Sequence, residues 1–236
     1  MTQCSVAALE SISNRPEQHF VVDNDVSVRE SLALLIASAG WRSEMFASGQ
    51  EFLSRPRPLT PSCLVLEVTL PDLNGLDLQQ RIAADRLDMP IIFIANHSDI
   101  PMTVQAMKAG ALEFLTKPFD NEVLLRAVRC ALERSHAALG HEADLQALRA
   151  CHASLSSRER EVMALVVSGL LNKQVGRELG ISEITVKAHR GKVMRKMKAD
   201  SFAELVNMGA RLRLKIQAKG LTLRVPLLDA LSDAHA

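Results

Sequence analysis

Aromatic residues are scarce in this chain of 236 residues: they make up 3% of it, with one tryptophan and no tyrosine. Hydrophobic residues nevertheless reach 47% and charged residues 23%, values typical of globular domains. We therefore expect aliphatic cores. The length favours one or two domains, each with enough residues to bury a core.

Other absences exclude whole classes of protein. The four cysteines, Cys4, Cys63, Cys130 and Cys151, form no Cys-x-x-Cys pair, so we expect reduced thiols rather than a disulfide or zinc framework. The sequence contains no run of about 18 apolar residues and no basic-then-apolar leader. We predict a soluble, cytoplasmic protein without membrane contact.

Charge is unevenly distributed, although the net charge is only +1. The segment 17–125 carries 15 acidic and 8 basic residues, whereas 157–215 carries 13 basic and 6 acidic residues. An acidic half joined to a basic half indicates two domains, and the basic one is suited to a polyanion.

The acidic half alternates short apolar runs with amphipathic segments, after a polar extension at 1–16. The runs at 19–22, 42–46, 63–67, 90–94 and 112–115 predict five strands, each followed by a helix, and Ser27 is the expected N-cap of the first helix. This alternation predicts a doubly wound parallel sheet.

Polar residues stand at the ends of these predicted strands. Asp23 and Asn24 follow the first strand, Glu67 ends the third and Lys117 follows the fifth. The carboxyl ends of parallel strands share one edge of the sheet, where sites form. We expect these side chains to converge there, with Glu67 at the centre.

Three motifs identify the family that this half resembles. They are VVD at 21–23, LEVTLPDLNG at 66–75 and AMKAGALEFLTKPF at 106–119. Together they resemble the receiver domain of bacterial two-component response regulators, above all the FixJ group. The resemblance implies a flavodoxin-like (βα)5 receiver at residues 17–135.

The resemblance also implies a site. Receivers accept a phosphoryl group on an Asp at the end of the third strand, hold Mg²⁺ with two acids, and bind phosphoryl oxygens with a Thr or Ser and a Lys. By this resemblance Asp23 is the first acid, Lys117 the lysine and Phe114 the aromatic switch residue.

Three positions depart from the family pattern. Asn24 removes a negative ligand, Glu67 is one methylene longer than Asp, and Ala95 cannot donate a hydrogen bond. Reacting geometry must hold to within about 1 Å. We therefore expect ordinary aspartyl phosphorylation to be lost and no cofactor to be required, with at most a weak Mg²⁺ site at Asp23, Glu67 and the Thr69 carbonyl.

Three interpretations of this receiver stay open. It no longer switches and serves for dimerisation; or Glu67 meets Lys117 and mimics the switched-on state; or it keeps residual phosphorylation or takes another ligand. His97 and Asp99 are a weak metal candidate, and we expect them to be loop residues.

Residues 121–155 contain almost no helix breakers and predict a long helix with one soft point at Gly140. Its part at 136–153 would link the two domains. Its thin leucine stripe fits either self-pairing in a dimer or packing on its own domain.

The basic half, at 154–213, predicts four short helices with caps at Ser157, Asn172, Ser182 and Ser201. Short capped helices with tight turns form a helix-turn-helix domain. A tail at 214–236 has no assigned role.

The third of these helices has two contrasting faces. Val186, Val193 and Met197 point toward the core. The opposite face is basic or small, and consists of Lys187, Ala188, Gly191, Lys192 and Arg195. Small residues between long basic ones allow the helix to lie deep in a major groove.

The segment 180–194, GISEITVKAHRGKVM, resembles the LuxR-type DNA-binding domain of the same regulators. The resemblance implies that Lys187, Ala188 and Gly191 lie nearest the bases. It also implies that four residues are candidates for contact with the DNA phosphates: Thr185, Arg190, Lys192 and Asn172.

We therefore predict a sequence-specific transcriptional regulator rather than an enzyme. It would bind double-stranded DNA as a homodimer and contact RNA polymerase, with a histidine kinase partner left open. A phosphotransfer protein is disfavoured by Asn24, Glu67 and Ala95, and a purely structural module by the basic helix.

Overall fold

The computed structural model describes residues 17–56, 59–85, 88–96 and 100–212. The chain forms two compact units that divide between Ala147 and Leu148. The expected extension at 1–16, the tail, His97 and Asp99 lie outside the described residues.

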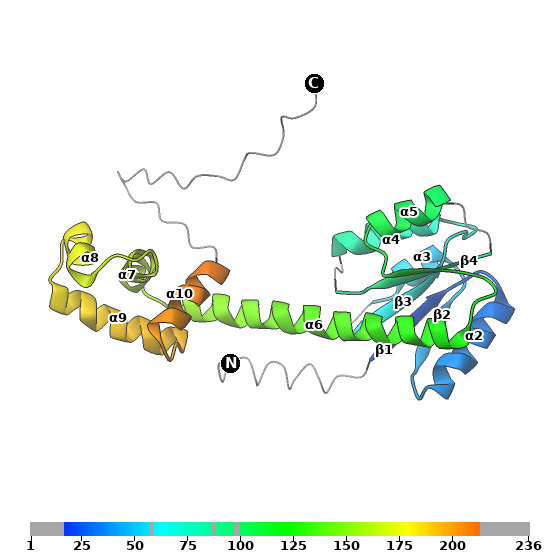
Figure 1. Cartoon of the computed structure of the whole chain (residues 1–236), viewed down its shortest axis with the longest axis horizontal. Coiled ribbons are helices and arrows are strands. Elements are labelled where there is room, and N and C mark those ends of the chain that lie inside the picture. Colours follow the sequence, from blue (N-terminus) through cyan, green and yellow to red (C-terminus); the bar gives the residue numbers. More distant parts are fainter. Residues whose placement is uncertain (1–16, 57–58, 86–87, 97–99, 213–236) are drawn as a thin grey trace, which may run out of the picture. The chain divides into compact units, whose positions relative to one another are not determined.

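The first unit is built on a sheet of five parallel strands in the order β2-β1-β3-β4-β5. Figure 1 shows this sheet with helices on both sides of it. The strands are β1 (Gln18–Val22), β2 (Ser43–Phe46), β3 (Ser62–Glu67), β4 (Ile91–Ala95) and β5 (Glu113–Thr116). Their connecting helices are α2 (Val26–Ser38), α3 (Gly49–Ser54), α4 (Gly75–Asp85) and α5 (Ile100–Lys108), and α6 (Asn121–Ala153) follows β5. The flavodoxin-like fold predicted from the sequence is confirmed.

Both faces of the sheet are covered, which explains why β3 is buried along its whole length. One core joins the sheet to α3, α4 and α5 through Phe52, Leu78 and Ala106. The other joins it to α2 and α6 through Ile36 and Val128. This packing fixes the strand ends, and with them the residues that follow.

The helix α6 runs without interruption for 33 residues, through Gly140. A single glycine lowers helix propensity but does not remove a backbone hydrogen bond, so the pattern on both sides continues the helix. Its early residues Leu124 and Leu132 belong to the core of the first unit, and Leu148 belongs to that of the second.

The second unit contains α7 (Ser157–Val167), α8 (Asn172–Leu179), α9 (Glu183–Met197) and α10 (Phe202–Arg211). Gly180 ends α8 in the left-handed conformation, with φ of 65°. At Gly176 a Cβ would lie 2.8 Å from the carbonyl oxygen of Ile181, so a glycine lets the chain pass closely from α8 to α9.

Three of the predicted caps were displaced by one or two residues. Asp25, not Ser27, caps α2; its side chain accepts hydrogen bonds from both the backbone and the hydroxyl of Ser27. Ser156, not Ser157, caps α7 and forms a capping box with Glu159. Adjacent residues of equal capping ability make such positions indistinguishable in a sequence.

The third displaced cap is at α8. Leu171 occupies the N-cap position, and the Gln174 side chain accepts a hydrogen bond from the Leu171 backbone N–H. Asn172 is the first helical residue instead, which frees its side chain for a contact with α9. The predicted caps Ser182 and Ser201 are confirmed.

Cys63 is buried, Cys151 is half-buried and Cys130 is exposed, and all three are free thiols. No helix in the described ranges is long and apolar enough to cross a membrane.

Candidate functional site

Three charged side chains meet at the carboxyl edge of the sheet, and we call Asp23, Glu67 and Lys117 the strand-end cluster. Asp23 follows β1, Glu67 is the last residue of β3, and Lys117 follows β5. The Nζ of Lys117 lies 2.7 Å from Oδ2 of Asp23 and 2.6 Å from Oε2 of Glu67. One ammonium group thus bridges two carboxylates, and the predicted convergence of these residues is observed.

The remaining carboxylate oxygens are also hydrogen-bonded. Oδ1 of Asp23 accepts from the backbone N–H of Asp25 at 2.8 Å, and Oε1 of Glu67 accepts from that of Thr69 at 3.1 Å. All four carboxylate oxygens of the cluster therefore already accept a hydrogen bond from the protein. The Arg29 guanidinium also donates a hydrogen bond to the backbone carbonyl oxygen of Asp23 at 2.6 Å.

The cluster is well shielded from water. The side chains of Asp23 and Glu67 are 1% and 3% exposed, and that of Lys117 is 13% exposed. Burial by itself lowers the pKa of Lys117, but hydrogen bonds and charge attraction from both carboxylates outweigh it, so the pKa of Lys117 is raised. Lys117 is held in its charged form, as two buried carboxylates require.

The other predicted receiver residues surround this cluster without joining it. Asn24 and Thr69 are exposed, and Ala95 is buried at the end of β4. Phe114 is half-buried, and the centre of its ring lies 6.0 Å from the centre of the Phe93 ring. Ala95 offers only a methyl group, so no hydroxyl comes from this position.

The residues do not fit the Mg²⁺ ion that receivers hold. The Lys117 ammonium stands between the two carboxylates that would bind the ion, and like charges repel strongly at such distances. Asn24 supplies no negative charge. Among the residues that the structure describes, no group of three or more His, Cys, Asp or Glu side chains could hold a metal ion.

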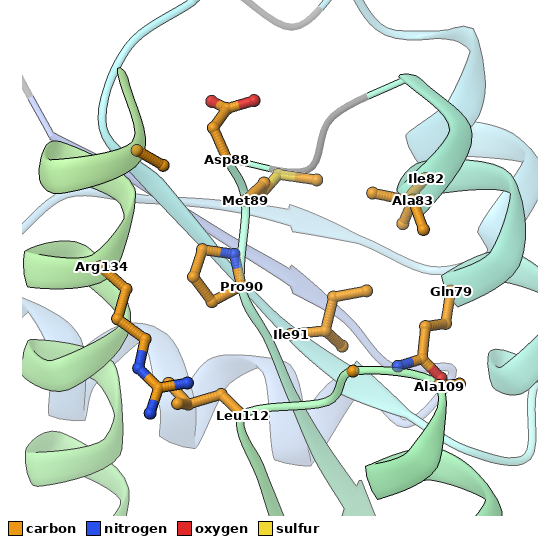
Figure 2. A pocket seen from close by; sticks show the side chains of 12 residues that line it. Gln79, Ile82, Ala83, Asp88, Met89, Pro90, Ile91, Ala109, Leu112 and Arg134 are labelled. Atoms are coloured by element: carbon orange, nitrogen blue, oxygen red, sulfur yellow. The ribbon is translucent and has the colours of Figure 1, made fainter. Parts of the chain in front are cut away.

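A separate cavity of about 310 Å³ lies at the opposite edge of the sheet (Figure 2). Ile91 and Leu112, near the starts of β4 and β5, line it with Gln79 of α4 and Arg134 of α6. The Gln79 amide donates to the Ala106 carbonyl at 3.2 Å, while its Oε1 has no partner in the described part of the chain. Because it opens at strand starts, this cavity is not part of the strand-end cluster.

The second candidate site is the outward face of α9. Val186, Val193 and Met197 are at most 1% exposed and fill the core of the second unit. The exposed residues of the helix include Lys187, Ala188, Gly191, Lys192 and Arg195. The face predicted from the sequence is therefore present and open.

Two of the predicted phosphate-binding residues contact each other. Arg190 donates to Oδ1 of Asn172 at 3.3 Å, and its guanidinium lies 4.3 Å from the centre of the Phe202 ring. This places Arg190 between α8 and α10, where it holds α9 to both neighbours. Thr185 pairs with the Ser182 hydroxyl at 2.8 Å.

The sequence did not single out three acidic or basic residues of this unit. Lys196 donates to Glu159 at 2.7 Å, across 37 positions of sequence, and such a pairing carries no local signal. The hydrogen bond from Lys196, then that from the Ser156 backbone, lowers the pKa of Glu159 to about 2. Glu183 pairs with Lys187 at 3.2 Å, and its spacing of four residues could have revealed it.

Comparisons with known proteins identify the family of each half of the chain. Residues 20–129 match the response regulator receiver domain, and residues 153–209 match the bacterial regulatory proteins of the luxR family. Nodulation protein W of Bradyrhizobium diazoefficiens is 49% identical over 193 residues, which cover 82% of this chain and 85% of that protein. The transcriptional regulatory protein FixJ of the same organism is 40% identical over 192 residues, covering 81% and 94%.

A solved structure is similar to this chain over most of its length. The response regulator StyR matches with a TM-score of 0.75 and 43% sequence identity, covering 84% of this chain and 100% of that one. Both halves and their order in the chain are thus shared with known regulators. The chain belongs to the response regulators that join a receiver domain to a LuxR-family DNA-binding domain, and it is a DNA-binding regulator of transcription.

Proposed function

We propose that this protein binds duplex DNA through α9 without control by aspartyl phosphorylation of its receiver. The observation that carries the proposal is the bridge from Lys117 to both Glu67 and Asp23. A carboxylate that attacks a phosphoryl group needs a free oxygen and a nearby cation to neutralise the transferred charge. Here the cation is already neutralised and each oxygen is already hydrogen-bonded.

The three departures from the receiver pattern, like this bridge, disfavour phosphorylation. The longer Glu67 side chain brings its carboxylate to Lys117, Asn24 contributes no charge, and Ala95 provides no hydroxyl to follow a phosphoryl group. The contact between Glu67 and Lys117 supports the hypothesis that the glutamate supplies the negative charge that phosphorylation supplies elsewhere. The receiver would then stay in one state.

The test compares DNA binding with and without a small phosphodonor and Mg²⁺, using fluorescence anisotropy on a duplex selected by the protein itself. We expect the affinity of the natural chain to stay the same within twofold. The matched variant carries Asn24→Asp, Glu67→Asp and Ala95→Thr, and we expect its affinity to respond to the donor. A response of the natural chain equal to that of the variant would contradict the proposal.

The proposal includes a homodimer. Ile100, Val104 and Met107 are 81%, 43% and 43% exposed and recur on one face of α5. An exposed apolar face of this kind is suited to a second copy of the receiver. Sedimentation equilibrium should give a dimer that Val104→Glu with Met107→Glu dissociates, whereas Gln105→Glu, at an exposed position on another side of the same helix, should not.

The proposal also places RNA polymerase among the partners, because a transcription regulator acts on the enzyme that reads the promoter. Transcription in vitro from a promoter that contains the selected sequence would test this. Added protein should change the transcript level, and a mutated binding sequence should abolish that change.

A further inference from the structure

Ile184 is a large apolar side chain that takes no part in the core. It is 80% exposed, whereas Val186 on the same helix is completely buried. A β-branched residue has lower helix propensity than many alternatives, so local helix stability does not explain its presence. Its side chain is available to a partner.

Ile184 stands on the same side of α9 as Ala188 and Gly191. The intervals are four and three residues, which place all three in one row along a helix. All three are exposed. The row therefore starts with a bulky apolar group near the helix N-terminus and becomes small toward its middle.

Gly191 adds an independent observation. A Cβ at this position would meet nothing within 4 Å, and Gly191 is not among the glycines with positive φ. Glycine weakens a helix interior relative to alanine. Nothing in the described protein requires this glycine, in contrast to Gly176, so its smallness serves something that approaches from outside.

We infer that Ile184 contacts the C5-methyl group of a thymine in the major groove, and that it thereby sets base preference. This inference rests on the proposed DNA binding through α9. Residues near the N-terminus of a recognition helix reach base edges, and the thymine methyl is the apolar feature that the major groove offers. The flanking Lys187 and Lys192 supply charge for the phosphates and polar base edges, which an isoleucine cannot contact favourably.

The experiment begins with selection of bound sequences from random duplexes by the full-length protein. Each thymine of the selected sequence is then replaced by uracil, which lacks only the methyl group. We expect one position in each half-site to lose about fourfold in affinity, the factor that corresponds to burial of one methyl group. Ile184→Ala should bind thymine and uracil duplexes equally at this position.

Two variants make the result specific. Ile184→Val keeps a branched apolar side chain and should retain most of the uracil penalty. Leu171→Ala removes another exposed apolar side chain, 71% exposed and outside α9, and should retain the whole penalty. Circular dichroism should show that all three variants fold, since the substituted side chains are exposed.

The outcomes separate the inference from the function on which it rests. If selection enriches a sequence but the uracil penalty is the same for the natural chain and Ile184→Ala, the inference is overturned. If no uracil substitution changes affinity, Ile184 contacts no thymine methyl and the inference also fails. If selection enriches no sequence at all, the proposed function fails and the inference falls with it.

Discussion

The strand-end cluster and the outward face of α9 carry charge in opposite ways. In the cluster, Lys117 is shared between two buried carboxylates, and every carboxylate oxygen is hydrogen-bonded. On α9, Lys192 and Arg195 are exposed, and Lys187 is paired with the exposed Glu183. The first site is closed on itself, and the second is open to a polyanion.

The difference has an energetic consequence. Charges buried together are costly to separate, because the low dielectric around them raises the energy of any charge left alone. Exposed charges are screened by salt and contribute little to folding. The cluster should therefore affect stability strongly and DNA binding little, while the exposed face of α9 should do the reverse.

Loss of Lys117 should give the largest effect. Lys117→Met leaves Asp23 and Glu67 buried side by side without a cation, and we expect a loss of about 3–5 kcal/mol in the free energy of unfolding. Urea unfolding followed by circular dichroism measures it. The control Lys108→Met removes an exposed lysine of α5 and should cost less than about 0.5 kcal/mol; equal losses in the two variants would remove the contrast.

Loss of Lys187 should affect recognition instead. Lys187→Ala should reduce preference for the selected sequence over a scrambled one by about 1–3 kcal/mol. Lys192→Ala should weaken binding to both duplexes evenly and lower the slope of log affinity against log salt by about 1. Unchanged preference in Lys187→Ala would show that this side chain does not read bases.

Much of the fold could be predicted from the sequence, because apolar runs, glycines and capping residues record local structure. The convergence of Asp23, Glu67 and Lys117 followed from the parallel sheet alone. Their hydrogen-bond saturation did not, since it depends on side-chain rotamers and on the backbone N–H groups of Asp25 and Thr69. Sequence pattern sets which residues meet, and packing decides which atoms are left free.

The same limit applies to α9. The sequence predicted which residues are exposed, but it treated Arg190 and Asn172 as independent phosphate ligands. Their mutual contact arises because α8 begins at Asn172 itself, one residue earlier than a cap at that position would require. A one-residue shift of a helix start thus changed the interpretation of a side chain on another helix.

The pH dependence of stability should differ between the two units. Glu159 has a pKa of about 2 when folded against 4.5 unfolded, so its contribution is present above 4.5 and is lost as the pH falls toward 2. The raised pKa of Lys117 acts at the other end: its contribution is present below 10.5 and is lost as the pH rises through the folded value.

Glu159→Gln should therefore reduce the loss of thermal stability at acid pH and leave the loss of stability at alkaline pH unchanged. Thermal unfolding of the full chain between pH 2 and pH 5 would show it. The matched variant Glu161→Gln changes the exposed neighbour on α7 and should lose as much stability at acid pH as the natural chain. An identical loss at acid pH in the natural chain and Glu159→Gln would contradict the assigned role of the Lys196 pair.

The smallest effect should come from Glu183. Glu183→Gln removes an exposed acid that pairs with Lys187 at the start of α9, and such pairs contribute about 0.3–0.5 kcal/mol. Because the acid also repels phosphates, its removal should raise DNA affinity about twofold at low salt. The gain should vanish at high salt, where charges are screened.

The closed state of the strand-end cluster is tested most directly by the intact mass of the protein after incubation with a small phosphodonor and Mg²⁺. We predict that the natural chain gains no phosphoryl group, while the variant with Asn24→Asp, Glu67→Asp and Ala95→Thr gains one. A stable phosphorylated species of the natural chain that disappears in Glu67→Gln would contradict a receiver closed by Lys117.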